Sequence, residues 1–355
     1  MALYLRPTAF IDSPVGFDGQ FMRLAGGMSF FSAFEVIAVE DGARVSKRLV
    51  PVGEIDAVVA GDEAATTALA RLTSPRAALA LGERMIRLDQ PQVMGILNMT
   101  PDSFSDGGKH DGDAEAAASA GVAMAAAGAA MIDVGGESTR PGAKPVWEGD
   151  EIARTVPVIE RLARAGVTVS IDTRKAAVMG AALAAGATLV NDVSALGHDP
   201  QAVALMAGAT CPVVIMQWPD AKTHDGGTYR DPLIETYDWL AARISTLEAA
   251  GIARSRLIVD PGIGFGKGVA ENLALLNGLS LFHGLGCPLL VGASRKRFIG
   301  ALAGEAPVED RLAGSLAIAL KAAEQGTPIL RVHDVPETVQ ALKIWRGLRD
   351  QGLSG

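Results

Sequence analysis

The stretch that decides the fold is Val93-Met-Gly-Ile-Leu-Asn98, an apolar run that ends in a polar side chain. The same pattern recurs along the rest of the chain, and a helix-like segment follows each run. The further runs begin at Met131, Val167, Leu189, Val213, Leu257, Leu289 and Ile329, which makes eight in all. Strands that are apolar on both faces and alternate with helices are typical of a parallel sheet.

The segments between these runs are rich in Ala, Leu, Arg and Glu, with apolar residues spaced by three and four. Examples are 151–165, 233–250, 309–325 and 336–348. This spacing predicts amphipathic helices. Eight strand–helix units in roughly 260 residues predict an α/β fold of the (β/α)8 TIM-barrel type. A doubly wound open sheet is the alternative, but it gathers its functional residues at one switch point, whereas here nearly every run ends in a polar residue.

Residues 1–90 do not follow this pattern. They contain the aromatic stretch Phe30-Phe31-Ser-Ala-Phe34, a charged stretch at 40–48 and an acidic turn that begins at Gly61. A helix capped by Thr73 or Ser74 is expected over 75–86. We therefore predict an N-terminal α+β extension of unknown role over residues 1–90, followed by the barrel over residues 91–350.

The composition excludes some classes of partner. The chain has 355 residues and a formal net charge of −8, so a broad basic surface for nucleic acid is not expected. Any phosphate binding must then be local. The Ala-rich stretch 114–132 contains Glu115 and leads into Asp133, which favours a buried helix and strand over a membrane span.

The cysteine content and the N-terminus bear on location. Cys211 and Cys287 each precede an apolar run, which favours buried free thiols in a reducing compartment. The first residues lack a basic segment followed by an apolar one, so no signal peptide is expected. These features predict a cytoplasmic protein.

The polar residues that follow the apolar runs are the candidates for chemistry, because the loops after the strands form the active site of such a barrel. They are Asn98, Thr100, Asp102, Glu137, Ser138, Thr139, Arg140, Asp172, Asn191, Asp192, Asp260, Ser294, Arg295, Lys296, Arg331 and His333. Any single one could simply cap the next helix, and this interpretation is favoured for Thr173, Ser194 and Asp334. Capping does not explain the whole set, in which charges of both signs converge from at least six loops.

The two signs of charge are separated along the chain. The cations Arg295, Lys296 and Arg297, and later Arg331 and His333, follow the last two strands, where barrels usually bind phosphate. A solvated basic face is the alternative. The carboxylates Asp172, Asp192 and Asp260 come earlier in the chain. Each could accept two parallel hydrogen bonds from the amino group and ring N–H of a flat heterocycle, and Asn191 could both donate and accept at such an edge.

The glycine-rich segment Gly262-Ile-Gly-Phe-Gly-Lys-Gly268 matches neither a Walker A sequence nor G-x-G-x-x-G. It could cradle phosphate, let a ring approach the backbone or only form a turn. The polar loops within 95–108 and 135–142 could cover a ligand. The five histidines are scattered, so a zinc site is not expected.

Taken in order, these segments closely resemble the dihydropteroate synthase family over residues 92–348. The most specific segments are Asn98-Met-Thr-Pro-Asp-Ser-Phe-Ser-Asp-Gly-Gly108, Gly135-Gly-Glu-Ser-Thr-Arg-Pro-Gly142, Ser170-Ile-Asp-Thr173, Asn191-Asp192, Asp260-Pro-Gly-Ile-Gly-Phe-Gly-Lys267, Ser294-Arg-Lys296 and Arg331-Val-His-Asp334. The resemblance implies a TIM-barrel homodimer that joins 4-aminobenzoate to (7,8-dihydropterin-6-yl)methyl diphosphate. The products would be 7,8-dihydropteroate and pyrophosphate.

The resemblance also implies roles for individual residues. Asp172, Asn191, Asp260 and Lys296 would hold the pterin, Arg331 and His333 the diphosphate, and Asn98 a Mg²⁺ ion, while Thr139 would contact substrate. The first two loops, with Asp102, Phe104, Arg140 and Pro141, would close over the aminobenzoate, and Phe265 and Arg297 would lie nearby. Asp102, Thr139, Arg140, Asp172 and Lys296 are the expected catalytic residues. Thr139, Arg140 and Pro141 are predicted to set sensitivity to sulfonamides, which resemble 4-aminobenzoate.

One departure concerns the loop after the fifth strand. Members of the family often have a Met-His pair there, whereas this chain has Met216-Gln217-Trp218-Pro219. Two other functions are considered. A folate-dependent methyltransferase barrel would share the pterin carboxylates but lack the diphosphate cations, and a non-catalytic homologue would only bind pterin.

Overall fold

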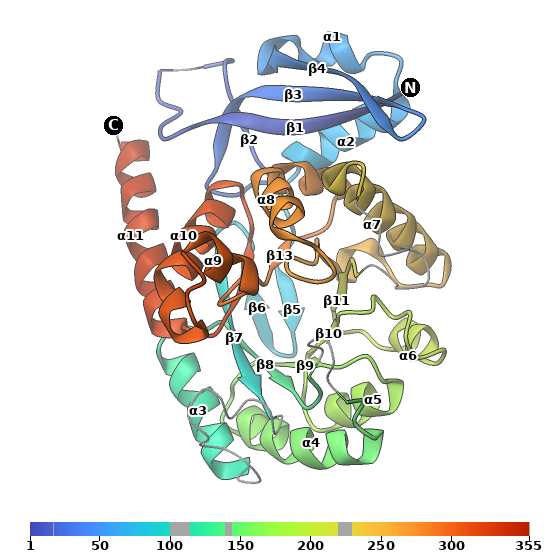
Figure 1. Ribbon diagram of the computed structural model, residues 1–355, viewed down its shortest axis with the longest axis vertical. Helices are drawn as coiled ribbons and strands as arrows, with labels where there is room; N and C mark the ends of the chain where they lie inside the picture. The colour runs from blue at the N-terminus through green and yellow to red at the C-terminus, as the bar shows by residue number, and fades with distance from the viewer. Residues whose placement is uncertain (17, 100–113, 139–143, 219–228, 355) are drawn as a thin grey trace.

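A computed structural model describes residues 1–16, 18–99, 114–138, 144–218 and 229–354 (Figure 1). The eight predicted runs form eight parallel strands. They are β7 (Gln92–Asn98), β8 (Met131–Gly135), β9 (Val169–Asp172), β10 (Leu189–Asp192), β11 (Val213–Met216), β12 (Leu257–Asp260), β13 (Leu290–Val291) and β14 (Ile329–Val332). Their order in the sheet is β12-β11-β10-β9-β8-β7-β14-β13.

The two ends of this sheet meet. Val259 on β12 forms a parallel bridge with Leu289, which directly precedes β13, and its amide donates to the Pro288 carbonyl at 2.9 Å. The sheet therefore closes on itself. The prediction of a (β/α)8 barrel is confirmed, and the open doubly wound sheet is excluded.

Helices connect the strands on the outside of the barrel. They are α3 (Ala114–Ala126), α4 (Glu148–Arg164), α5 (Ala176–Ala184), α6 (Ala202–Gly208), α7 (Pro232–Ala249), α8 (Val269–Asn277), α9 (Arg297–Leu302), α10 (Leu312–Glu324) and α11 (Val335–Ser354), with the 3-10 turns η3 (Arg254–Arg256), η4 (Leu279–Leu285) and η5 (Val308–Arg311). The four helices expected from apolar spacing correspond to α4, α7, α10 and α11.

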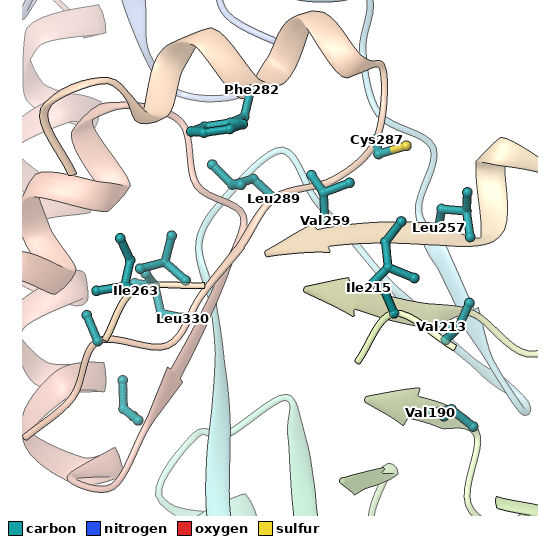
Figure 2. Packing of buried hydrophobic residues seen from close by; sticks show 14 of the residues in the cluster. Val190, Val213, Ile215, Leu257, Val259, Ile263, Phe282, Cys287, Leu289 and Leu330 are labelled. Atoms are coloured by element: carbon teal, nitrogen blue, oxygen red, sulfur yellow. The ribbon is translucent and has the colours of Figure 1, made fainter. Parts of the chain in front are cut away.

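Alternate residues of each strand face opposite sides of the barrel wall. On β11, Val213 and Ile215 pack with the helices, whereas Val214 belongs to a separate apolar cluster inside the barrel. Figure 2 shows part of the outer cluster, in which residues of neighbouring strands meet the segment before β13. Its labelled members include Val190, Val213, Ile215, Leu257, Val259, Phe282 and Leu289.

A β-hairpin closes the amino-terminal end of the barrel. Strands β5 (Leu79–Leu81) and β6 (Arg84–Ile86) pair in antiparallel register around Gly82, whose φ is +63°. Leu79 and Leu81 pack against the inner cluster of the barrel. The predicted helix over 75–86 is therefore wrong. Alternation of Leu79 and Leu81 with an exposed Ala80 is a strand pattern, and Gly82 supplies the left-handed turn.

The rest of the N-terminal region is an antiparallel sheet with two helices. It comprises β1 (Ala2–Ile11), β2 (Met22–Arg23), β3 (Phe30–Glu40), β4 (Ala43–Pro51), η1 (Val52–Glu54), α1 (Ile55–Val59) and α2 (Glu63–Thr73). Strand β3 is central, with β1, β2 and β4 as its partners. The sheet has its own buried core, which includes Phe31 and Phe34 in an edge-to-face contact.

This sheet contacts the barrel at η4 and, through hydrogen bonds of β1, at α7 and α8 (Figure 1). The Tyr4 hydroxyl donates to Asp238 on α7 at 2.8 Å, and Arg44 pairs with Asp231, which caps the same helix. Ser280 in η4 donates to the Pro7 carbonyl at 2.7 Å. The N-terminal region is thus held to one side of the barrel wall.

Two expectations about surroundings can be compared with the structure. Within the described ranges, no helix is long and apolar enough to cross a membrane. Both cysteines are free thiols; Cys287 is buried as expected, whereas Cys211 is only partly buried. Burial raises the pKa of both thiols.

Candidate active site

A guanidinium shared by two carboxylates lies inside the carboxyl-terminal end of the barrel. Arg331 on β14 donates through Nε to Asp133 Oδ2 and through Nη2 to Asp172 Oδ2, both at 2.6 Å. Burial opposes a charge here, but Asp133 and Asp172 raise the pKa of Arg331. One cation therefore faces two acids from β8 and β9. The carboxylate oxygens can still accept hydrogen bonds from further N–H donors.

Asp133 is a site residue that sequence reasoning missed. Its side chain is completely buried, and its Oδ2 also accepts a hydrogen bond from Asn191 Nδ2 at 2.9 Å. The available signal was a carboxylate in the middle of an apolar strand, which requires a buried partner. Among the described residues, Asp133 Oδ1 and the nearby Ser170 Oγ have no hydrogen-bond partner. Buried oxygens of this kind are acceptors that a ligand with several N–H groups can use.

The electrostatic state of Asp172 follows from its surroundings. Burial raises the pKa of Asp172 to about 7, while the Arg331 guanidinium acts in the opposite direction. Asp133 and Asp192 add to the increase because they carry the same charge. A carboxylate with this pKa changes its protonation state readily when a ligand binds.

A second carboxylate and a lysine lie across the same end of the barrel. Asp260 at the end of β12 accepts a hydrogen bond from the Gly262 amide at 2.7 Å, and burial raises its pKa. Lys296 donates to the Ile263 carbonyl, and its ammonium lies 3.9 Å from the centre of the Phe265 ring. Burial lowers the pKa of Lys296 to about 7, against the attraction of Asp260. The structure thus brings the predicted residues Asp260, Phe265 and Lys296 together.

The remaining basic residues follow β13 and β14. His333 donates its amide to Ser294 Oγ at 3.2 Å, and its Nδ1 lies 3.1 Å from the same oxygen. Arg295 forms an ion pair with Asp334, with Nη2 2.5 Å from Oδ1. The Asp334 side chain thus orients Arg295, a contact that the capping interpretation did not include.

Asp192 has a structural role. Its carboxylate accepts hydrogen bonds from the amide and hydroxyl of Ser194 and from the amide of Leu196. Burial raises the pKa of Asp192 to about 6, while the hydrogen bonds from Ser194 oppose that increase. The local turn after β10 therefore explains this acid, and the adjacent Asn191 is the residue that faces Asp133.

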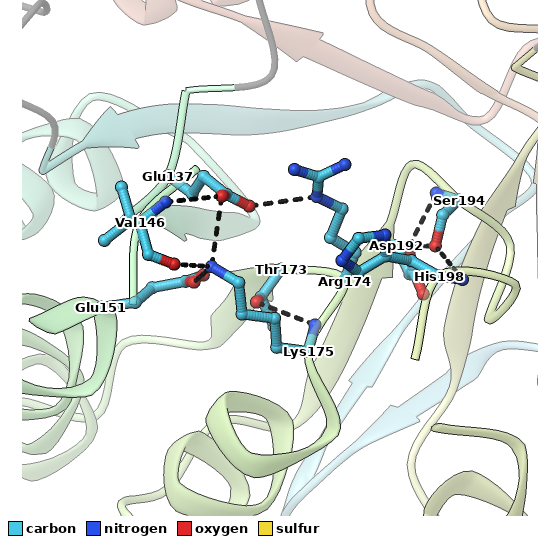
Figure 3. Close-up of polar contacts among 9 residues, drawn as sticks. All are labelled: Glu137, Val146, Glu151, Thr173, Arg174, Lys175, Asp192, Ser194 and His198. Atoms are coloured by element: carbon cyan, nitrogen blue, oxygen red, sulfur yellow. Dashed lines mark hydrogen bonds and ion pairs between the residues drawn. The ribbon is translucent and has the colours of Figure 1, made fainter. Parts of the chain in front are cut away.

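A buried ionic network lies beside the end of β8, the second strand of the barrel (Figure 3). Glu137 accepts hydrogen bonds from the Val146 amide at 3.0 Å and from Arg174 Nε at 3.0 Å. Lys175 Nζ lies 3.2 Å from Glu137 and 2.6 Å from Glu151, and it also donates to the Val146 carbonyl. The network connects the residues on either side of 139–143 to α4 and to the start of α5.

Asn98 is the residue expected to bind magnesium. A Cβ added to Gly135 would lie 3.5 Å from Asn98 Oδ1 and 3.8 Å from Asp172 Oδ2, so both oxygens reach the same part of the barrel end. The described residues contain no group of three acidic, His or Cys side chains that could hold a metal alone. Mg²⁺ commonly binds through one or two protein oxygens together with substrate phosphates, so the site fits this ion in the presence of a diphosphate.

Several predicted residues lie outside the described part of the chain. They are Thr100, Asp102, Phe104, Thr139, Arg140 and Pro141. The residues that are described, from Asn98 on β7 to His333 after β14, converge at the carboxyl ends of the strands. The fold and this group of buried charges define a TIM-barrel enzyme with a site for a polar heterocycle and an anionic group.

Comparison with known proteins narrows this class. A family described as pterin binding enzyme matches residues 94–333. Dihydropteroate synthase of Escherichia coli strain K12 is 46% identical over 260 residues, which are 72% of this chain and 91% of that protein. A Xanthomonas albilineans dihydropteroate synthase structure with 4-aminobenzoic acid is 48% identical with a TM-score of 0.71, covering 77% of this chain and 98% of that one. A structure from the same organism in complex with 7,8-dihydropteroate is 42% identical with a TM-score of 0.68, covering 77% and 98%.

This chain belongs to the dihydropteroate synthase family of pterin-binding enzymes. The family match begins at Met94, so the N-terminal sheet precedes it.

Proposed function

We propose that this enzyme joins 4-aminobenzoate to (7,8-dihydropterin-6-yl)methyl diphosphate and releases pyrophosphate. The observation that carries the proposal is the buried group of Asp133, Asp172, Asn191 and Arg331 at the barrel end. Two acids, one amide and one guanidinium in a dry environment suit a ring that carries an amino group, ring N–H donors and a carbonyl. The family to which the chain belongs supplies the particular reaction.

The pterin ring is proposed to lie between the pair Asp133 and Asp172 on one side and Asp260 on the other. Asp172 and Asn191 would contact one edge of the ring, and Asp260 and Lys296 would contact another. Asn191 and Asp260 are more than nine-tenths buried, and Asp172 and Lys296 are partly buried, so hydrogen bonds to the ring would form with reduced competition from water. The unpartnered oxygen of Asp133 gives the ring one further acceptor.

The diphosphate is proposed to lie toward β14, where Arg331 and His333 would hold it. Asn98 would supply the protein oxygen for Mg²⁺. When bound, Mg²⁺ neutralises the charge that develops on the leaving diphosphate. Arg331 contributes the same kind of stabilisation from the protein side, and its charge is already held in place by two acids.

The chemistry requires no protein nucleophile. The bond between the pterin methylene carbon and the diphosphate oxygen breaks, the aminobenzoate nitrogen forms the new bond to that carbon, and the proton lost by that nitrogen passes to water or to the released diphosphate. Asp172 and Asp260 would favour the positive charge that develops on the pterin–methylene unit, since both lie at its proposed position. Binding both substrates in line and excluding water supplies the remaining rate enhancement. Asp102, Thr139, Arg140 and Phe265 are proposed to position the aminobenzoate.

Purified full-length protein tests the proposal. Release of pyrophosphate is measured with the pterin diphosphate, 4-aminobenzoate and Mg²⁺, and dihydropteroate is detected as the second product. Release only when all three are present is expected. Binding of pterin with no release of pyrophosphate would show a non-catalytic homologue and would overturn the assignment.

We also propose that the enzyme is a homodimer in the cytoplasm. Ile344 and Leu348 are one turn apart on α11, and both side chains are more than half exposed. Exposed apolar side chains in such a row suit a contact between subunits. Sedimentation equilibrium of the wild type and of Ile344→Glu tests this, with a twofold difference in mass expected.

A further inference from the structure

Lys267 occupies a cage of oxygen atoms beside the site. Its ammonium lies 2.6 Å from Gln217 Oε1, 3.1 Å from the Gly262 carbonyl and 3.3 Å from the carbonyls of Gln217 and Phe265. Burial lowers the pKa of Lys267 to about 7, against the attraction of Asp260. Four acceptor oxygens and three N–H donors form a complementary set, so this geometry favours the protonated lysine.

The cage joins two loops. Gln217 directly follows β11, and its amide side chain also contacts the Tyr229 hydroxyl at 3.3 Å. Gly262 and Phe265 belong to the glycine-rich loop after β12. A Cβ at Gly262 would lie 2.0 Å from the Gln217 carbonyl, and its φ is +71°. Only glycine permits this close approach, which places both loops within reach of one ammonium.

The glycine-rich loop in turn holds a proposed pterin ligand. Lys296 donates to the Ile263 carbonyl and lies over the Phe265 ring, and its side-chain stem passes so close to Gly264 that a Cβ there would lie 2.4 Å from Lys296 Cδ. Trp218 packs on the same Phe265 ring with a centroid distance of 5.3 Å. Any shift of the segment between Gly262 and Lys267 would therefore move the surface on which Lys296 lies.

We infer that Lys267 is a positioning residue for pterin binding. It acts by tying the loop after β11, at Gln217, to the glycine-rich loop, which fixes Phe265 and Lys296 in the geometry that accepts the ring. Lys267 itself need not touch the substrate. This role rests on the proposed function, because it assumes that Lys296 contacts the pterin.

The test compares Lys267→Met, Gln217→Leu and the double variant, with Lys321→Met on the exposed face of α10 as the control for a lost lysine charge. Binding of 6-hydroxymethyl-7,8-dihydropterin to the full-length protein is measured by calorimetry, and KM and kcat are measured separately by pyrophosphate release. Lys267→Met is expected to raise Kd for the pterin and KM for the pterin diphosphate about tenfold or more, as for loss of a partly buried hydrogen bond from a charged group. Gln217→Leu should raise both by a smaller factor.

The double variant should bind the pterin no more weakly than Lys267→Met does, because both changes remove the same contact between the two loops. A lysine that only stabilises the fold would reduce the amount of active enzyme and leave Kd and KM unchanged. Unchanged Kd and KM in Lys267→Met, or factors that multiply in the double variant, would overturn the inference. If Lys267→Met does not fold, the inference stands or falls on whether Gln217→Leu raises Kd. Failure of the wild type to release pyrophosphate would overturn the proposed function, while the calorimetry would still decide the role of Lys267.

Discussion

The two ends of the barrel bury side chains of opposite kinds. At the amino-terminal end, Leu79 and Leu81 of the hairpin pack with apolar residues such as Met94 and Met131. At the carboxyl-terminal end, the same strands β7 to β9 present Asn98, Asp133 and Asp172, the last two paired with Arg331. The apolar end gains free energy from burial, whereas the polar end must hold charges out of water.

This difference assigns most of the stability to the apolar end of the barrel and the activity to the polar end. Apolar burial at one end, together with the shell of helices, makes the barrel stable enough to keep several acids and cations buried at the other. Substitutions at the polar end should change activity more than stability, and substitutions at the apolar end should do the reverse.

The largest effect is expected for Asp172→Asn and Lys296→Ala. Each removes a charged group from the proposed pterin site, so kcat/KM should fall on the order of 100-fold or more. The melting temperature should change by only a few degrees, since neither residue belongs to the apolar core. Steady-state kinetics and thermal unfolding measure the two quantities. Near-normal turnover in either variant would remove that residue from the site.

The next effect is expected at the opposite end of the barrel. Leu81→Ala should lower the free energy of unfolding by about 2–4 kcal/mol, because a buried leucine leaves a cavity. The KM values at 25 °C should stay as in the wild type. Met85→Ala is the matched control in the same hairpin. Met85 is 63% exposed, so its substitution should change the free energy of unfolding little. A large loss of substrate affinity in Leu81→Ala would show that the two ends are coupled.

A third effect depends on pH. The folded pKa of Asp172 is raised to about 7, so ionising this acid destabilises the folded state as pH rises from about 4 to 7. Asp172→Asn removes that penalty. The free energy of unfolding of the variant relative to the wild type should therefore increase between pH 4 and pH 7, by about 1.4 kcal/mol for each unit of pKa shift. Chemical denaturation at several pH values measures it, and a pH-independent difference would contradict the raised pKa.

The smallest effect is expected outside both ends, where the N-terminal sheet meets α7. Tyr4→Phe removes the hydroxyl that donates to Asp238, so the free energy of unfolding should fall by about 1 kcal/mol or less. Activity should not change. Limited proteolysis and denaturant unfolding detect any loosening of the sheet, and a drop of several kcal/mol would show that this single contact controls its attachment.

Much of the barrel could be predicted from sequence because its signals are local. A run such as Val213-Val-Ile-Met216 is apolar at every position, and strands of this kind need a sheet covered on both faces. The hairpin at 79–86 cannot be told from a helix by sequence, because three-residue strands give only one alternation, which a helical turn can also produce. Packing of Leu79 and Leu81 inside the barrel decided between the two.

The sequence by itself determined the eight polar-ended strands and predicted Asp172, Asn191, Asp260, Lys296 and Arg331 as candidate site residues. Their common location follows from their places at the ends of strands, since the carboxyl ends of parallel strands meet at one end of a barrel. Only the tertiary structure decided how the charges pair. Arg331 and Asp133 are 198 residues apart in the chain, and Lys267 and Gln217 are 50 apart. Such contacts depend on distance in space and on burial, which no local pattern of residues encodes.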